Sequence, residues 1–488
     1  MANADHLRVL LSPEWPQWRA ANPRIIPDFV DADLHGQDLR GKDLSRAVFD
    51  RADLQGANLT GASLAHARLE GAQLQGAVLE GADCSGLRFD LLEVRGCKLR
   101  GANLAGATFR GTDFTGSDLV GTKLAQANFD GAILDRADFG QADLSGASFR
   151  GARLEGTRLV GANLTSAVLE GVSLSGNDLT GANLQGALAT RVQFSLARMG
   201  GARLLKANLR ETNFLNANLA KADFEGADLT HSTLRGANLA GAHLVGCDAQ
   251  AADFREADLN DAEMNGVQFA AAQLSGIDFR TAKIGKLSLV RANLTGATLT
   301  GCNLRMWRFE QARLEGADLR DANLESANLE GAILTGASLR GARLRQANLA
   351  NVSALDADFS GADLILADLR GAELSRCDLR FAKIVGANCA RASFRFANCQ
   401  KADFTKAAVG GASFWGARLA GTKLPLSALH WSLGRVITAV LAATQRRRQE
   451  AEQRDQQRRV RETVRLVREL EEKDARLRRQ TQRTTKSS

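Results

Sequence analysis

Apolar side chains recur at every fifth residue through most of this chain. From Phe29 to Leu424, all 80 residues whose numbers end in 4 or 9 are apolar, and no insertion or deletion breaks the spacing. We call these the central positions; 49 of them are Leu and 19 are Phe. A period of five suits neither an amphipathic helix, with its period of about 3.6, nor a single strand, with its period of two. The pattern predicts short extended segments joined by tight turns.

The positions around each central residue are also regular. Ala usually lies two residues before it, Asp or Asn one residue before it, and Gly often two residues after it, as around Leu59. The central residue and the small residue are expected to point inward, while Gly supplies the geometry of a turn. Because each coil can bury its inner face only against its neighbours, the array is predicted to be a one-dimensional all-β solenoid.

This Ala-(Asp/Asn)-(Leu/Phe)-x-Gly pattern resembles the pentapeptide-repeat family, at residues 57–61 and at dozens of other copies. The resemblance implies a right-handed quadrilateral β-helix with four pentapeptides in each coil, and hence about 20 coils over residues 29–424. At one strand spacing per coil, the rod would be roughly 95 Å long. The string from Trp15 to Pro23 is similar to the leader that precedes many bacterial arrays of this family.

The distribution of Phe offers a check on the length of the coil. A coil of 20 residues would stack central residues that are 20 apart, as Phe89, Phe109, Phe129 and Phe149 are. Of the 19 central Phe residues, 14 fall in two of the four possible columns. Stacked rings gain dispersion and aromatic contacts, so this bias supports the 20-residue coil.

Residues 1–28 are predicted to form a leader that caps the array. Ser12 and Pro13 suit the N-cap and the first position of a short helix, which would carry Trp15 and Trp18. Without a cover, the first coil would expose unpaired backbone groups and apolar central residues. We expect the leader to cover that coil.

The five-residue period stops at Pro425, and two further segments are predicted beyond it. Residues 425–445 place apolar side chains at helical spacing and are expected to form a helix that caps the last coil, with a membrane-surface helix as the alternative. Residues 446–488 are expected to form a basic helical or coiled-coil tail with a disordered end. A thin apolar seam in this tail is the candidate for homodimer formation, and it consists of Val460, Val464, Val467, Leu470 and Leu477.

The net charge of +8 comes from the tail. Residues 29–424 contain 44 basic and 44 acidic side chains, whereas residues 425–488 contain 16 basic and 8 acidic ones. The N-terminus has no basic start followed by an apolar run, so no signal peptide is expected. No stretch of about twenty apolar residues predicts a membrane span. We expect a cytoplasmic protein.

Residue types that often perform catalysis or bind metals are explained here by the repeat. All seven Cys occupy inward positions, where Cys serves as a small apolar residue, and their spacing does not match a zinc site. The six His are scattered, and Asp, Asn and Gly recur with the repeat itself. These residues therefore indicate neither a carboxylate pair nor a phosphate loop. We expect no catalytic residues, no metal site and no cofactor.

Departures from the pattern are better candidates for a binding site. Trp307 occupies a position that normally holds Ala, and we expect it to strain the coil or to point outward. Arg280, Arg320, Arg340 and Arg380 share one outward column that could face an anionic partner, although a solvated face is the simpler interpretation. Exposed apolar patches often mark partner sites, with packing by the C-terminal helix as the alternative. The candidate partner surface lies on two edges of the last five coils and comprises Ile365, Leu366, Val385, Phe396 and Trp415.

These observations favour a non-enzymatic scaffold that binds another protein, of unknown identity. An alternative is a DNA mimic that binds a topoisomerase, because gyrase-protecting proteins resemble this fold; those proteins are acidic, whereas this array is balanced. A third possibility is a nucleic-acid or anionic-membrane binder that uses the basic tail, although the tail mixes acids with bases and has little aromatic content.

Overall fold

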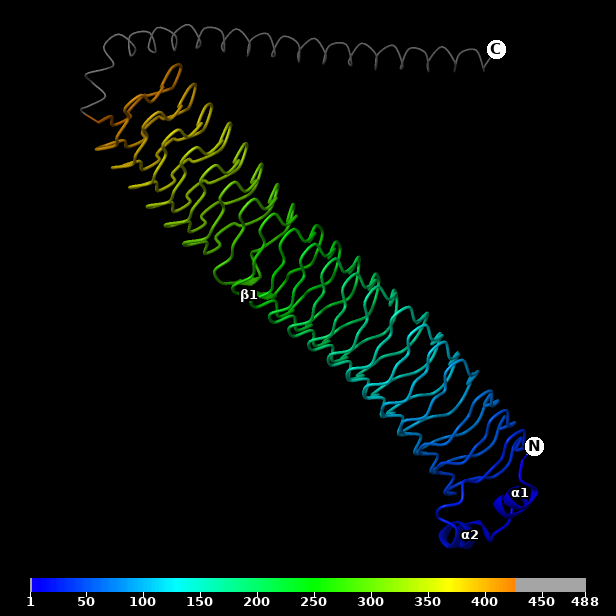
Figure 1. Ribbon diagram of the computed structural model, residues 1–488. Helices are drawn as coiled ribbons and strands as arrows, with labels where there is room; N and C mark the ends of the chain where they lie inside the picture. The colour runs from blue at the N-terminus through cyan, green and yellow to red at the C-terminus, as the bar shows by residue number, and fades with distance from the viewer. Residues whose placement is uncertain (1, 426–488) are drawn as a thin grey trace, which may run out of the picture.

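The computed structural model describes residues 2–425. The capping helix predicted over 425–445 lies outside the described residues from 426 on, as do the basic tail and its apolar seam. A long rod of stacked coils follows a small helical cap at the N-terminus (Figure 1). The cap consists of α1 (Ala4–Leu10) and α2 (Trp15–Ala21), and two short strands in the rod, β1 (Glu263–Met264) and β2 (Lys283–Ile284), pair in parallel.

Adjacent coils pair through parallel bridges between residues that are 20 apart. Asp33 bridges to Asp53 and Asp53 to Gln73, and the same register recurs to the last coil. Within it, most central N–H groups donate to the carbonyl 19 residues later, as Leu54 does to Gln73 at 2.8 Å. The predicted coil of four pentapeptides is confirmed, and its four faces meet at four edges, each formed by one turn.

Nearly every edge is formed by β-turns in which the residue two after the central position adopts a left-handed conformation; the exceptions are Thr281 and Lys286. The N–H of Ala57 donates to the carbonyl of Leu54 at 3.0 Å, and Gly56 has φ of 63°. A positive φ at the third residue is the mark of a type II turn. Glycine takes 42 of these positions and other residues take 35, so the turn tolerates side chains even though the conformation favours Gly.

The Asp and Asn residues before the central positions have a structural role. Their side-chain oxygens accept a hydrogen bond from the backbone N–H two residues later, as Asn128 does from Asp130 at 2.8 Å and Asp138 from Gly140 at 2.9 Å. Such short-range bonds are the Asx turns that favour Asp and Asn in tight turns. This explains the polar residue of the repeat without any functional role.

The core is a column of central residues inside the coils. Phe129 stacks on Phe109 and Phe149 with ring centroids 4.8 and 5.1 Å apart, as the Phe columns predicted. Where Thr, Ser, Cys or Asn replaces the small inward Ala, its side chain can donate to a carbonyl 23 residues earlier; Thr112, for example, bonds to Phe89 at 2.6 Å. These bonds satisfy polar groups that would otherwise be costly to bury.

The leader lies against the first coil. Trp15 is fully buried, stacks on Trp18 and contacts Phe29, and its indole N–H donates to the carbonyl of Asp43 at 3.1 Å. The guanidinium of Arg19 donates hydrogen bonds to the Asp43 carboxylate and to the backbone carbonyls of Ile25 and Ser45.

The predicted start of the leader helix is wrong by two residues. The helix α2 begins at Trp15 with Glu14 as its N-cap, and Pro16 lies in its first turn. Ser12 instead closes α1, since its hydroxyl donates to the carbonyl of Val9 at 2.9 Å and accepts from the N–H of Glu14. The helix α1 itself was not predicted; Asn3 caps its N-terminus.

One edge of the rod is irregular near β2. The N–H of Gly266 donates to the carbonyl of Lys286, one residue later than the regular register. Gly285 comes one residue before the usual glycine position, and a Cβ there would lie 2.3 Å from Oδ1 of Asn265. The ladder between β2 and the following coil is interrupted here, because no bridge joins Lys283 to Asn303 within residues 2–425.

The outward display favoured for Trp307 is wrong. Its side chain is only 1% exposed and stacks on Phe309 with ring centroids 5.8 Å apart. In the 20-residue register Trp307 follows Leu287, which comes directly after the irregular edge. We attribute the burial to that edge, where Ile284 is only partly buried and the register shifts by one residue.

Candidate interaction surface

The predicted partner residues lie on two edges that are diagonally opposite. Ile365, Leu366 and Val385 share one edge, which we call the aliphatic edge. Phe396 and Trp415 share the edge two turns further along the coil, which we call the aromatic edge. The structure therefore keeps the five residues in two groups and does not gather them into one patch.

The aromatic edge is a compact cluster. Phe396 and Trp415 lie on adjacent coils with ring centroids 4.6 Å apart in an edge-to-face arrangement, and the guanidinium of Arg395 lies 5.1 Å from the centre of the Trp415 ring. The Phe396 ring rests over Gly416, where a Cβ would lie 2.4 Å from it. Trp415 remains 51% exposed, so this cluster offers a ring and a cation to a partner.

Phe381 was not predicted, although it is exposed on the edge between the other two. The ammonium of Lys401, on the next coil, lies 5.2 Å from the centre of its ring. The signal that could have found it is a large apolar residue at the position that usually holds Gly. Three consecutive edges of the last coils therefore carry exposed apolar side chains.

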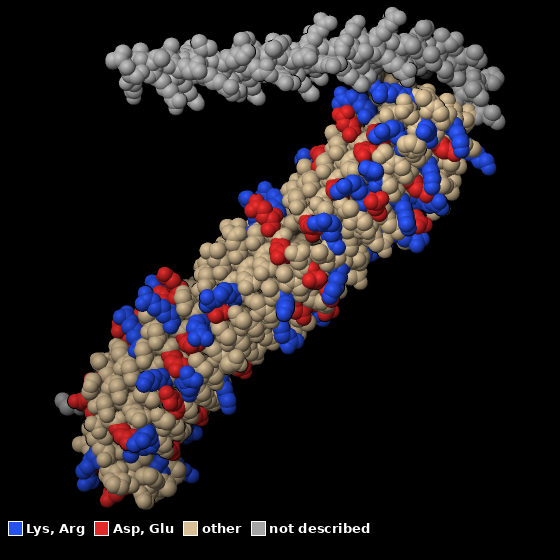
Figure 2. Space-filling view, turned by 180° about the vertical axis from the view of Figure 1, so that it is seen from behind, with Lys and Arg blue, Asp and Glu red and all other residues tan. Residues whose placement is uncertain are grey.

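The predicted Arg column is largely neutralised. Arg340 follows Ser338 and has no acidic residue two positions before it. Hydrogen bonding by Arg320 lowers the pKa of Asp318 to about 2, so that pair remains charged at neutral pH. Basic and acidic side chains alternate along most of the rod in the same way (Figure 2). Besides Arg340, the column consists of three Arg residues that each form an ion pair at 2.6 Å with the Asp two residues earlier. The pairs are Arg280–Asp278, Arg320–Asp318 and Arg380–Asp378.

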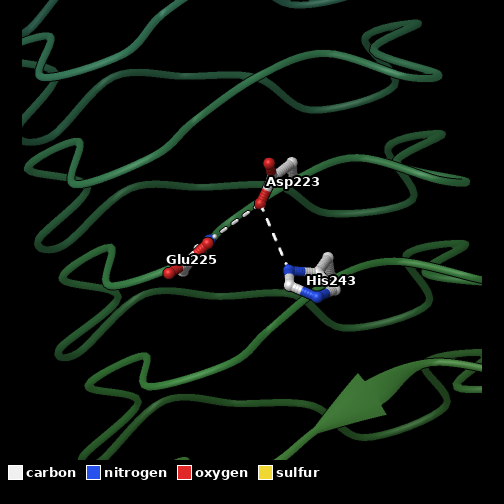
Figure 3. Close-up of side chains that lie close together, drawn as sticks. All are labelled: Asp223, Glu225 and His243. Carbon is white, nitrogen blue, oxygen red and sulfur yellow. Dashed lines mark hydrogen bonds and ion pairs between the residues drawn. The ribbon is translucent and has the colours of Figure 1, made fainter.

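His243, Asp223 and Glu225 lie together on one face, in a group that could hold a metal ion (Figure 3). Nδ1 of His243 is 3.5 Å from Asp223, while its Nε2 is 3.0 Å from Glu263. Glu263 in turn pairs with Lys283 at 2.9 Å, and this hydrogen bond lowers the pKa of Glu263. Ion pairs between stacked coils hold His243, and the backbone N–H of Glu225 donates to the Asp223 carboxylate at 3.1 Å. The group is explained by these contacts, so we assign no metal to it. The 20-residue register could have predicted this group, because it places His243 beside Asp223 on the adjacent coil.

The seven cysteines are free and buried. Burial raises the pKa of Cys97 and of Cys247 to about 12, and the thiol of Cys97 donates to the carbonyl of Leu74 at 2.9 Å. A thiolate is the reactive form of Cys, so these thiols serve the core. Within residues 2–425, no helix has the length and apolar character needed to cross a membrane.

Comparison with solved structures gives similar chains of low identity. HetL, a pentapeptide repeat protein involved in heterocyst differentiation regulation from the cyanobacterium Nostoc, is 26% identical, with 55% of this chain and 91% of that chain covered and a TM-score of 0.17. QnrB1, a plasmid-mediated fluoroquinolone resistance protein, is 18% identical, with 65% and 96% covered and a TM-score of 0.15. A pentapeptide repeat protein from the thylakoid lumen of Arabidopsis thaliana is 26% identical, with 28% and 71% covered and a TM-score of 0.10.

No curated protein matches this chain. The family model described as "Pentapeptide repeats" matches in overlapping segments from residue 28 to 269 and from 337 to 408, with short gaps. The model described as "Pentapeptide repeat region" matches residues 262–349. Together they cover most of the rod, whose parallel coils form a right-handed β-helix solenoid. This chain therefore belongs to the pentapeptide-repeat family.

Proposed function

We propose that this protein is a non-enzymatic scaffold in the cytoplasm that holds another protein on its last coils. The observation that carries the proposal is the set of exposed apolar side chains on three consecutive edges between residues 365 and 415. Their exposure has no folding benefit, because burial is what makes apolar surface stabilising. A binding partner that covers these side chains would bury them and so make them stabilising.

A DNA mimic is less well supported by the same surface. Mimicry of DNA requires a continuous negative field, whereas many carboxylates of this rod are paired with Arg on the same or the adjacent coil. Binding of nucleic acid or anionic membrane through the tail rests on residues beyond 425. Binding experiments with DNA and with vesicles distinguish both possibilities from a protein partner.

Site-specific photo-crosslinking tests the docking surface. We expect a benzoylphenylalanine at Leu366 or Trp415 to yield a discrete adduct in an extract of the native cell. Leu91 is the matched control, because it is 81% exposed and has the same left-handed backbone as Leu366. The double variant Leu366→Ser, Val385→Ser should lower the yield at Trp415 at least about tenfold if one partner spans the edges. Equal yields at 91 and 366 would refute the proposal.

The tail gives a separate expectation, for a homodimer. Its seam is too thin to stabilise an isolated helix, so pairing with a second copy would provide the packing. Removal of residues 446–488 should then convert a weak dimer into a monomer in sedimentation velocity, while the thermal unfolding of the rod stays unchanged. A dimer in both chains would place the interface on the rod, and a monomer in both would exclude the seam.

A further inference from the structure

The rod is electrically polarised, although its charges balance overall. Residues 381–425 carry seven basic side chains and one acidic side chain, Asp403. The rest of the array, residues 29–380, therefore has an acidic excess of six. On the face drawn in Figure 2, basic side chains lie at the upper, C-terminal end of the rod, with acidic ones among them.

Most cations of this end lack the partners that other Arg residues of the rod have. Arg320, Arg370 and Arg380 each bond to the Asp two residues earlier. At the basic end, Lys423 pairs with Asp403 at 3.1 Å. Within residues 2–425, five further exposed cations of this end form no ion pair, namely Lys383, Arg391, Arg395, Lys401 and Lys406. Their charge is available to a ligand.

These cations alternate with the exposed apolar side chains. Arg395 lies against Trp415 on the aromatic edge, and Lys401 lies against Phe381 on the next edge. On the aliphatic edge, Lys406 continues the column of Leu366 two coils later. Aromatic residues and Arg are the side chains that contribute most at protein interfaces, and the cations around them would select a partner by its charge.

The backbone at these apolar residues is unfavourable for folding alone. Leu366, Phe381 and Phe396 have φ of 60°, 60° and 58°, where Gly is the usual residue. A left-handed conformation costs a bulky side chain of order 1 kcal/mol or more. Apolar residues with this backbone also occur elsewhere, as at Leu91, Leu196 and Met306. What distinguishes the last coils is that three of them lie within two coils of one another.

We propose that the last coils bind a protein partner whose surface places carboxylates around apolar anchors. The inference rests on the proposed function and specifies the chemistry of the partner. The tail over residues 446–488 does not fit, since it is itself basic, with 15 basic and 8 acidic residues. A second copy of the same surface would be repelled by like charge. Nucleic acid would leave the aliphatic edge unused, because bases need stacking and phosphate contacts.

Binding of defined polyanions to the full chain tests this inference. The main ligand is a fluorescein-labelled peptide with six Glu-Glu-Phe repeats, compared at equal charge with oligoglutamate and with a thirteen-residue oligo-dT, and separately with vesicles containing phosphatidylglycerol. We expect the Glu-Glu-Phe peptide to bind most tightly, and its affinity to fall at least about fivefold between 50 and 200 mM salt. The double variant Arg395→Glu, Lys401→Glu should weaken it at least about tenfold.

The matched control variant is Lys98→Glu, Arg110→Glu, which removes the same net charge from exposed residues in the acidic part of the rod. It should leave the affinity within about twofold, and circular dichroism should show both variants folded. Equal weakening by both variants would overturn the inference, as would tighter binding of oligo-dT, of vesicles or of oligoglutamate. If the photo-crosslinked partner proves to be neutral or basic, the scaffold function stands and the acidic partner does not.

Discussion

Phe129→Asp is expected to destabilise the rod by at least about 4 kcal/mol, because it removes a buried ring and buries a carboxylate without a partner. Phe129 stacks between Phe109 and Phe149, and its edges contact Phe114 and Phe139 at centroid distances of 6.0 and 5.7 Å. The surrounding Phe rings offer neither a hydrogen-bond donor nor a cation to a carboxylate. Thermal unfolding followed by circular dichroism should show a large fall in Tm or a separate early transition in the central coils.

Ala125→Asp is the matched control, since it adds the same charge four residues earlier at an outward position. It should change stability by less than about 0.5 kcal/mol. The Phe129→Asp defect should also grow as pH rises from 5 to 8. A buried carboxyl has a raised pKa, so the folded variant holds its proton at a pH where the unfolded chain has released it. Equal shifts in Tm for the two variants would show that the inward register is wrong.

Much of this fold follows from the sequence because its contacts repeat. One apolar residue in five determines which side chains point inward, and the columns of Phe indicate the 20-residue coil that the parallel bridges confirm. The exceptions depend on local packing, which the five-residue period does not determine. Trp307 is buried one coil after an irregular edge around Gly285, a glycine that is one residue out of phase with the repeat.

The candidate surface was only partly predictable. Ile365, Leu366, Val385, Phe396 and Trp415 were identifiable as outward apolar residues, and the structure leaves them at two edges of the rod. Phe381 was overlooked, although it occupies the same turn position as Leu366 and Phe396 and lies on the edge between the other two. The total charge of residues 29–424 is balanced and therefore did not reveal the basic end. It combines the acidic excess of residues 29–380 with the basic excess of residues 381–425.

The leader provides the second large effect, through Arg19. Its side chain is only 7% exposed and bonds to the Asp43 carboxylate at 3.1 Å, to the carbonyl of Ile25 at 2.9 Å and to the carbonyl of Ser45 at 2.8 Å. Arg19→Ala leaves two carbonyls and a carboxylate without these donors. We expect a loss of about 2–4 kcal/mol in the local stability of the cap. Hydrogen exchange should report it as faster exchange of amides in residues 29–49.

Arg24→Ala is the control for this variant, because Arg24 is exposed in the same leader and forms no ion pair in the described part of the chain. Its exchange pattern should match that of the unsubstituted protein. Coils of a solenoid contact only their neighbours, so the effect of Arg19→Ala should fade along the rod and leave the amides around Leu204 unchanged. Uniform acceleration along the whole rod would mean that the cap supports the entire array cooperatively. No acceleration near Phe29 would mean that Trp15, fully buried against that ring, holds the leader in place without Arg19.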